Sequence, residues 1–250
     1  HLAGSTTGPG GADGKGSQAR FGAVYGVVAK RDGTLYVADK GNYTIRRITS
    51  DGVVSTIAGR SGHLGTADGR GADARFLAPY DIANASDGVF VLDEELYHTD
   101  ARIRHVSAAG EVQTIARAGG SCADGREPAD VLALCDTVEA IASDASDNIY
   151  ALETTRIRRI NTNGTITTVA GVPGLLERGF RDGKGKDARF DARAASIAVG
   201  PDGNLYVYEP LNQAVRVVTP DGDTKTLVSG PPLPGYAKDS TIAVGDDGST

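Results

Sequence analysis

The chain contains no methionine or tryptophan and has only two cysteines and four histidines among its 250 residues. No apolar run approaches the roughly 20 residues that a membrane-spanning helix requires, so the sequence predicts no membrane insertion by this segment. The chain does not begin with methionine and shows no secretion signal at its start. We therefore expect a mature product or part of a longer protein.

Positive charge is in short supply. Lysine and arginine number 26 against 32 aspartates and glutamates, which gives a net charge of −6. Nucleic-acid-binding proteins concentrate positive charge to neutralise phosphates. The balance therefore predicts no nucleic-acid partner, although a local basic patch is compatible with it.

The chain is rich in glycine, with 34 residues, and it contains a sequence repeat that occurs four times. The first copy reads ADGKGSQARF, then DGTLYVAD, NYTIRRI and DGVVSTIAG, and the third copy is the most degenerate. An Ala-Gly or Ser-Gly marks the copy boundaries near Gly4, Gly59, Gly119, Gly171 and Gly230, a spacing of roughly 52 to 60 residues. Repeats of this length made of short β segments are typical of propellers.

One copy contains four predicted strands. They cover Val24 to Ala29, Leu35 to Ala38, Thr44 to Ile48 and Val53 to Ala58. Asp-Gly pairs separate the first strand from the second and the third from the fourth, and such pairs between apolar runs favour tight hairpins. Each copy is therefore predicted to be a four-stranded antiparallel meander, the blade of a propeller.

The predicted fold class is an all-β propeller domain over 1–250, with four complete blades and a partial one. The blades span approximately 5–59, 60–119, 120–171 and 172–230, and the partial blade spans 231–250. The first residues read as the end of an outer strand, and the last ones read as an inner strand and its turn. We therefore expect a sector of a larger ring.

The repeat resembles that of the NHL-repeat β-propellers. The matching positions are Val27 to Ala29, Asp32, Gly33, Leu35 to Asp39, Asn42, Ile45 to Ile48 and Thr56 to Gly59. The resemblance covers nearly the whole chain and implies a ring of about six blades. It also implies a protein-interaction, RNA-binding or extracellular module, although some relatives are enzymes and the fold alone does not decide.

Glycine-rich linkers precede three of the copies. Gly14 and Gly16 match the dinucleotide-binding fingerprint on paper, but that fingerprint requires a strand before it and a helix after it. Because the pattern recurs between β segments, we interpret these glycines as shaping the turn between blades. The aromatic rings of Phe21, Phe76 and Phe190 are then predicted to fill the gaps between blades.

An acidic residue ends the second strand of every copy, and an arginine follows on the third strand. The pairs are Asp39 with Arg46, Asp93 with Arg104, Glu153 with Arg158, and Glu209 with Arg216. A ligand site would use one or two blades, whereas these pairs occur in all four. We interpret them as ion pairs that fix loops, each contributing about 0.5–1 kcal/mol if exposed.

Cys122 and Cys135 flank the degenerate linker of the third copy. A disulfide between them would contribute about 3 kcal/mol and would indicate an oxidising compartment. With no histidine cluster nearby, the pair is a poor zinc motif. Two free thiols remain the alternative.

Three Asn-x-Ser/Thr sequons occur, at Asn42, Asn84 and Asn163. They are candidate glycosylation sites and support a secreted chain, although chance alone would supply about one and a bacterial source would remove their meaning.

Catalytic patterns are missing. The four histidines occupy unrelated repeat positions, and no Ser-His-Asp order or nucleophile elbow occurs. Polar groups predicted at the channel mouth are Tyr25, Tyr80, Asp81, Glu139 and Ser196. The first four are the predicted binding residues, on the face of the long linkers, where binding residues usually lie. Asp81 and Glu139 could ligate Ca²⁺, but they lack a fixed spacing. We predict no catalytic residue, no metal site and no cofactor.

These observations favour a non-enzymatic protein-interaction or structural module of a larger extracellular or cell-surface protein. Its partner would be another protein or a neighbouring domain. The alternatives are a propeller-type lyase or hydrolase with an axial metal, and an intracellular scaffold that binds RNA or protein.

Overall fold

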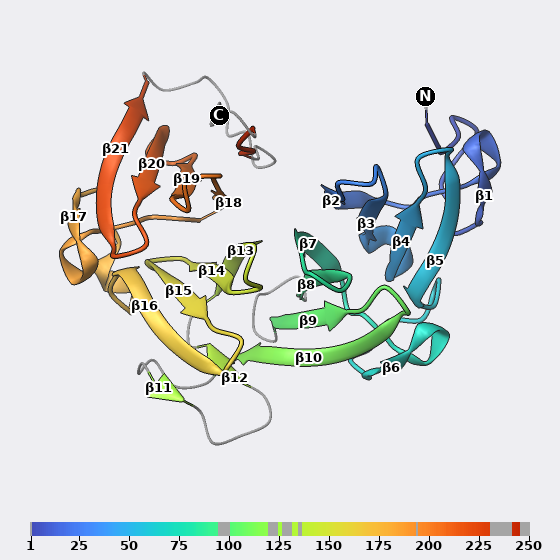
Figure 1. The fold of residues 1–250 in the computed structure, drawn as a ribbon, viewed down its shortest axis with the longest axis horizontal. Coiled ribbons are helices and arrows are strands. Elements are labelled where there is room, and N and C mark those ends of the chain that lie inside the picture. The colour runs from blue at the N-terminus through green and yellow to red at the C-terminus, as the bar shows by residue number, and fades with distance from the viewer. Residues whose placement is uncertain are drawn as a thin grey trace. The chain divides into compact units, whose positions relative to one another are not determined.

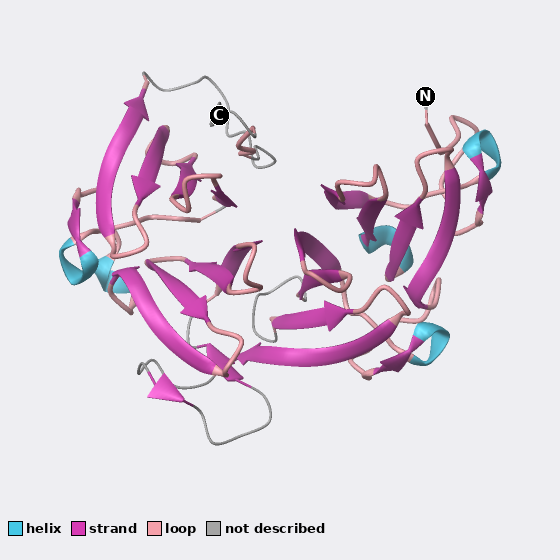
Figure 2. Cartoon of the chain, in the orientation of Figure 1, coloured by secondary structure: helices cyan, strands magenta, loops and turns pink. Residues whose placement is uncertain are grey.

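The computed structural model describes residues 2–94, 101–119, 125–126, 132–134, 137–193, 195–230 and 242–245. These residues form β-sheets whose only helices are short 3₁₀ turns (Figure 2). The chain divides into two compact units, His1–Arg117 and Ala118–Thr250. Each unit contains two antiparallel sheets (Figure 1).

The first sheet of unit 1 confirms the predicted meander almost to the residue. It consists of β2 (Val24–Ala29), β3 (Leu35–Asp39), β4 (Thr44–Ile48) and β5 (Val53–Gly59), paired in sequence order. The Asp-Gly turns work as expected, because Gly33 and Gly52 adopt φ values of +82° and +84°, which are unfavourable for residues with a side chain.

The other sheets repeat this order. The second sheet of unit 1 consists of β7 (Pro79–Asn84), β8 (Val89–Asp93), β9 (Arg102–Val106) and β10 (Glu111–Ala118). In unit 2 the first sheet contains β13 (Val138–Ser143), β14 (Ile149–Glu153), β15 (Arg156–Ile160) and β16 (Thr165–Gly171). The last sheet contains β18 (Ser196–Val199), β19 (Leu205–Glu209), β20 (Ala214–Val218) and β21 (Asp223–Ser229).

Each sheet also has a short strand that the sequence did not predict. These two-residue strands are β1 (Gly14–Lys15), β6 (Gly69–Arg70), β11 (Gly125–Arg126) and β17 (Gly183–Lys184), each paired with the last strand of its own copy. A further short strand, β12, covers Leu132–Leu134. The linker therefore folds back over the outer edge of its own blade, which covers part of an otherwise open edge.

Single 3₁₀ turns follow three of these strands: η1 (Gly16–Gln18), η3 (Gly71–Asp73) and η5 (Gly185–Asp187). Two more are η2 (Lys40–Asn42), between β3 and β4, and η4 (Leu175–Glu177). The first of the glycine-rich patterns thus leads from a two-residue strand into a three-residue turn. That is not the strand and long helix that a dinucleotide-binding fingerprint needs.

Two of the three linker phenylalanines, Phe76 and Phe190, occupy the predicted gaps between blades. Phe76 is buried between the two sheets of unit 1, against Tyr36 and Ile45 on one side and Val91 on the other. Phe190 is buried between the two sheets of unit 2 in the same way. Phe21 packs on the other face of the first sheet and is only partly buried.

The two sheets of unit 1 are also joined by a lysine. The Lys30 ammonium, at the end of β2, donates hydrogen bonds to the carbonyl oxygens of Ala85 and Gly88 at 2.6 Å each. Because these carbonyls belong to the turn between β7 and β8, the inner edges of neighbouring blades are held together by polar contacts as well as by packing.

Some predictions fall outside the described residues. These are the pairing of Cys122 with Cys135 and nearly all of the partial blade at 231–250. The disulfide therefore stays a prediction.

Candidate functional site

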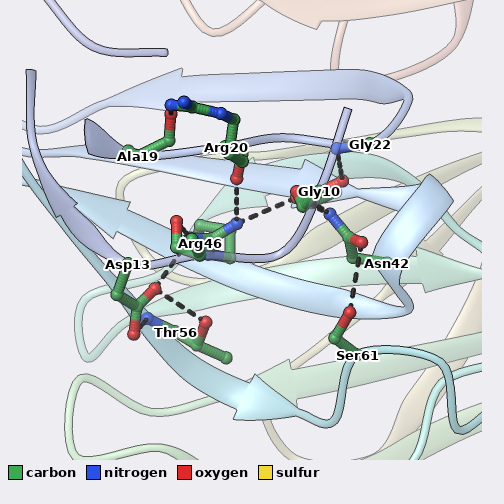
Figure 3. A network of polar contacts seen from close by, with 11 residues as sticks. Gly10, Asp13, Ala19, Arg20, Gly22, Asn42, Arg46, Thr56 and Ser61 are labelled. Carbon is green, nitrogen blue, oxygen red and sulfur yellow. Dashed lines mark hydrogen bonds and ion pairs between the residues drawn. The ribbon is translucent and has the colours of Figure 1, made fainter. Parts of the chain in front are cut away.

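The polar centre of each blade is a buried arginine. In the first sheet the Arg46 side chain is fully buried, and its guanidinium donates to the carboxylates of Asp39 at 3.0 Å and Asp13 at 2.7 Å (Figure 3). It also donates to the carbonyl oxygens of Arg20 and Ala12, at 2.9 Å each. One side chain thus joins the second strand, the third strand and the linker.

The same arrangement recurs in two more sheets. Arg104 donates to Asp93 at 3.1 Å and to Asp68 at 2.7 Å. Arg216 contacts Glu209 at 3.3 Å and Asp182 at 2.8 Å. Each arginine lies over the phenyl ring of its linker, with 5.1 Å from Arg46 to Phe21, 5.0 Å from Arg104 to Phe76 and 5.3 Å from Arg216 to Phe190.

The predicted pairing holds in these three sheets, and because the pairs are buried the energy given for exposed pairs does not apply to them. Asp39, Asp93, Glu209 and their arginines are all buried. In the third copy the carboxylate of Glu153 forms an ion pair with Arg156, and Arg158 is likewise buried. A buried pair is expensive to break from one side, because the remaining charge has no water to solvate it.

Burial sets the titration of two of these acids. Burial raises the pKa of Asp93 to about 6, against the opposing effect of the amide donors of Ala78 and Leu77 and of Arg104. Burial likewise raises the pKa of Glu209 to about 7, opposed by Asn212 and Arg216. At Asp68 burial also acts to raise the pKa, but hydrogen bonds from Thr114 and the Arg104 charge outweigh it and lower the value.

Sequence reasoning missed one member of each network. Asp13 opens the linker and accepts hydrogen bonds from the backbone amide of Thr56 at 3.0 Å and from its hydroxyl at 2.9 Å (Figure 3). Asp68 accepts the same pair of hydrogen bonds from Thr114, and Asp182 accepts them from Thr226. The recurrence of an aspartate before each Gly-Lys-Gly or Gly-Arg-Gly was the available signal.

The candidate site lies where the copies differ from one another. Register shifts in the first strand of three copies place Tyr25, Tyr80 and Glu139 at β-bulges. A bulge re-aims the side chain of its extra residue and is common beside binding sites. The scaffold therefore presents one variable residue from the same position of each of these blades.

In unit 1 the structure brings two of the predicted residues together. The rings of Tyr25 and Tyr80 lie 5.2 Å apart between centroids and are tilted by 42°. The Lys40 ammonium lies 4.2 Å from the centroid of Tyr25 and 5.2 Å from that of Tyr80. Val24, which directly precedes Tyr25 on β2, is 46% exposed. We call these four residues, Tyr25, Tyr80, Lys40 and Val24, the rim surface.

The other two predicted residues are placed differently. Asp81 follows the bulge on β7 and accepts a hydrogen bond from the amide of Ile82 at 2.8 Å. Glu139 belongs to unit 2, where its carboxylate accepts a hydrogen bond from the hydroxyl of Thr154 at 3.1 Å. Thr154 holds the repeat position of Lys40, directly after the acidic end of the second strand, so the bulge residue faces this position in both units.

The three sequons differ in accessibility. Asn42 is only 7% exposed, and its side-chain amide donates to the carbonyl of Gly10 and to Asp39 (Figure 3). A glycan at this position is incompatible with that geometry. Asn84 is exposed at the end of β7, where its amide donates to the carbonyl of Ala29 at 3.3 Å. Asn163 is exposed in the turn between β15 and β16.

Within the described residues, no group of three or more histidine, cysteine, aspartate or glutamate side chains is arranged to hold a metal ion. Nor does any helix among them have the length and apolar character needed to cross a membrane.

Comparison by sequence points to the teneurins. The chain is 29% identical to Teneurin-3 of Mus musculus over 230 residues and 30% identical to Teneurin-1 of Mus musculus over 233 residues. Each match covers 82% of this chain and 8% of the relative, so the chain spans a small part of the curated relatives. No family model matches the sequence.

Comparison by structure points to propellers. A streptogramin B lyase matches with a TM-score of 0.56 and 14% identity, over 95% of this chain and 63% of the lyase. A gluconolactonase from Xanthomonas campestris matches with a TM-score of 0.56 and 16% identity, over 90% of this chain and 66% of the enzyme. At these identities the likeness concerns the fold alone. The chain is an all-β protein whose antiparallel sheets are the blades of a β-propeller.

Proposed function

We propose that this chain is a non-enzymatic NHL-type β-propeller that serves as a protein-interaction module of a larger, extracellular protein. The contact with the partner is made through the rim surface of unit 1. The partner is another protein or a neighbouring domain of the same protein.

The proposal rests on a contrast between two groups of polar side chains, those repeated in every copy and those that differ between copies. The repeated acids, such as Asp39 and Asp93, are buried and occupied by arginines, so they hold the blades together. The side chains that differ between copies lie at bulges. Tyr25, which is 48% exposed, and the half-buried Tyr80 form an aromatic pair next to the exposed residue Val24. Tyrosines and exposed apolar side chains are typical of protein interfaces.

The extracellular location rests on other observations. Asn163 offers an exposed sequon, and the predicted Cys122–Cys135 disulfide would suit an oxidising compartment.

Site-specific photo-crosslinking in the native source tests the interaction. A photoreactive phenylalanine analogue replaces Tyr25 in one variant and exposed Thr162, in the β15–β16 turn, in the control. We expect a discrete crosslinked protein from the Tyr25 position only. Identical adducts from both positions, or none from either, would refute an interaction through the rim surface.

Location is tested separately, by labelling intact cells with an impermeant amine reagent. Because lysines such as Lys15 and Lys184 are exposed, an extracellular chain should be labelled without lysis. Labelling only after lysis would contradict the extracellular assignment and leave the interaction result unaffected.

A further inference from the structure

Lys40 differs from the other lysines whose contacts the structure shows. Lys15 and Lys184 form ion pairs with Asp51 and Asp221, and Lys30 donates to backbone carbonyls. The Lys40 ammonium instead lies over two aromatic rings. Among the described residues, no carboxylate forms an ion pair with it.

The fold keeps the neighbouring carboxylate away from Lys40. Asp39 directly precedes it, but the Asp39 carboxylate is buried and accepts hydrogen bonds from Arg46, Asn42 and the amide of Gly22. Lys40 itself begins the 3₁₀ turn η2, and Tyr43, which follows this turn, adopts the left-handed conformation with φ of 58°. The backbone under the ammonium is therefore set by the buried network.

Two tyrosines fix the position of the charge. A lysine over an aromatic ring is stabilised by about 0.5–1 kcal/mol at an exposed site, and here two rings contribute. An ammonium carries three donors, and the ring faces do not act as full hydrogen-bond acceptors. The arrangement thus holds a cation in place while leaving it able to donate to an incoming anion.

We propose that Lys40, held between Tyr25 and Tyr80, binds a carboxylate side chain of a partner protein. This inference rests on the proposed interaction function and specifies the partner's chemistry. The exposed residue Val24 directly precedes Tyr25 on β2, so we expect an aliphatic residue beside the acidic residue of the partner. Since this chain has a net charge of −6, long-range attraction does not select such a partner, and the local contact does.

A random dodecapeptide library displayed on phage tests this chemistry with the full chain as bait. Enriched peptides are synthesised and titrated by calorimetry against the wild type and Lys40→Gln, Lys40→Arg and Lys15→Gln. The last variant is the matched control, because Lys15 is an exposed lysine of the same unit that is paired with a carboxylate. Thermal unfolding checks that each variant folds.

We expect enrichment of aspartate or glutamate beside aliphatic residues. We also expect Lys40→Gln to weaken the Kd at least tenfold, Lys40→Arg to stay within about threefold, and Lys15→Gln to leave it unchanged. Enriched peptides without an acidic residue, an unchanged Kd for Lys40→Gln, or no enrichment at all would overturn the proposal. Crosslinking through Tyr25 in the native source would still stand in each of these cases, so the two failures are distinguishable.

Discussion

Replacing Arg46 with methionine should destabilise the first sheet strongly. Methionine fills much of the same space but lacks the guanidinium, which pairs with Asp39 and Asp13 and donates hydrogen bonds to two carbonyl oxygens. Asp13 is 48% exposed and can recover water. Asp39 is fully buried and would keep an uncompensated charge.

The magnitude follows from what remains around Asp39. Removing one partner of a buried ion pair costs about 3–5 kcal/mol. Because Asp39 retains hydrogen bonds from the Gly22 amide at 2.9 Å and from Asn42 at 2.7 Å, we expect the lower end, about 3 kcal/mol. Adding Asp39→Asn removes the stranded charge and should restore about 1–2 kcal/mol.

Native-state hydrogen exchange of the β4 amides measures the opening free energy of this sheet directly. The amides of β20, in unit 2, serve as the internal reference. Lys15→Met is the matched control, because the Lys15–Asp51 pair is exposed on both sides and should contribute less than about 1 kcal/mol. A loss for Arg46→Met no larger than that of Lys15→Met would refute the view that burial makes this network strong.

Three further predictions concern packing, pH and modification. Phe76→Ala should lower the free energy of unfolding by about 3–5 kcal/mol, because Phe76 is enclosed between two sheets. Phe21→Ala should lower it by about half as much, because Phe21 is only half-buried. Equal losses of unfolding free energy in urea titrations would contradict this difference. The raised pKa of Glu209, about 7, means that the folded state holds its proton more tightly. Stability should therefore fall as pH rises from about 4.5 to about 7, and Glu209→Gln should flatten the melting-temperature profile in that window. When the chain is directed through a eukaryotic secretory pathway by an added signal peptide, Asn163→Gln should remove a glycan and Asn42→Gln should not, as read by a mass shift with glycosidase.

The strands could be predicted because their signals are local. Asp-Gly turns and apolar runs placed β2 and β4 at their observed bounds, and the repeat spacing predicted the blades. The two-residue strand β1 could not be predicted in this way, because two residues show no alternation. It forms only because Gly14 and Lys15 reach Val54 and Val53 in three dimensions.

The site was predictable only in part. Tyr25 and Tyr80 were identified from their place at the start of the inner strands, but their contact depends on a bulge in each strand, which alternation does not reveal. Lys40 was missed because a lysine in a loop has the pattern of an ordinary solvated residue. The burial of Arg46 was missed for a different reason. Its partners Asp13 and Ala12 lie more than 30 positions away in the chain, so no local pattern indicates the contact.

The return of each linker to the last strand of its own copy has an evolutionary consequence. Because β1 pairs with β5, and Asp13 reaches both Arg46 and Thr56, one copy carries every polar group that its network needs. A tandem duplication with its ends at the Ala-Gly boundaries would therefore copy a complete blade together with its whole arginine-centred network. The array can therefore gain or lose whole copies by recombination, and a single copy can diverge, as the third has, while its neighbours keep their internal bonds.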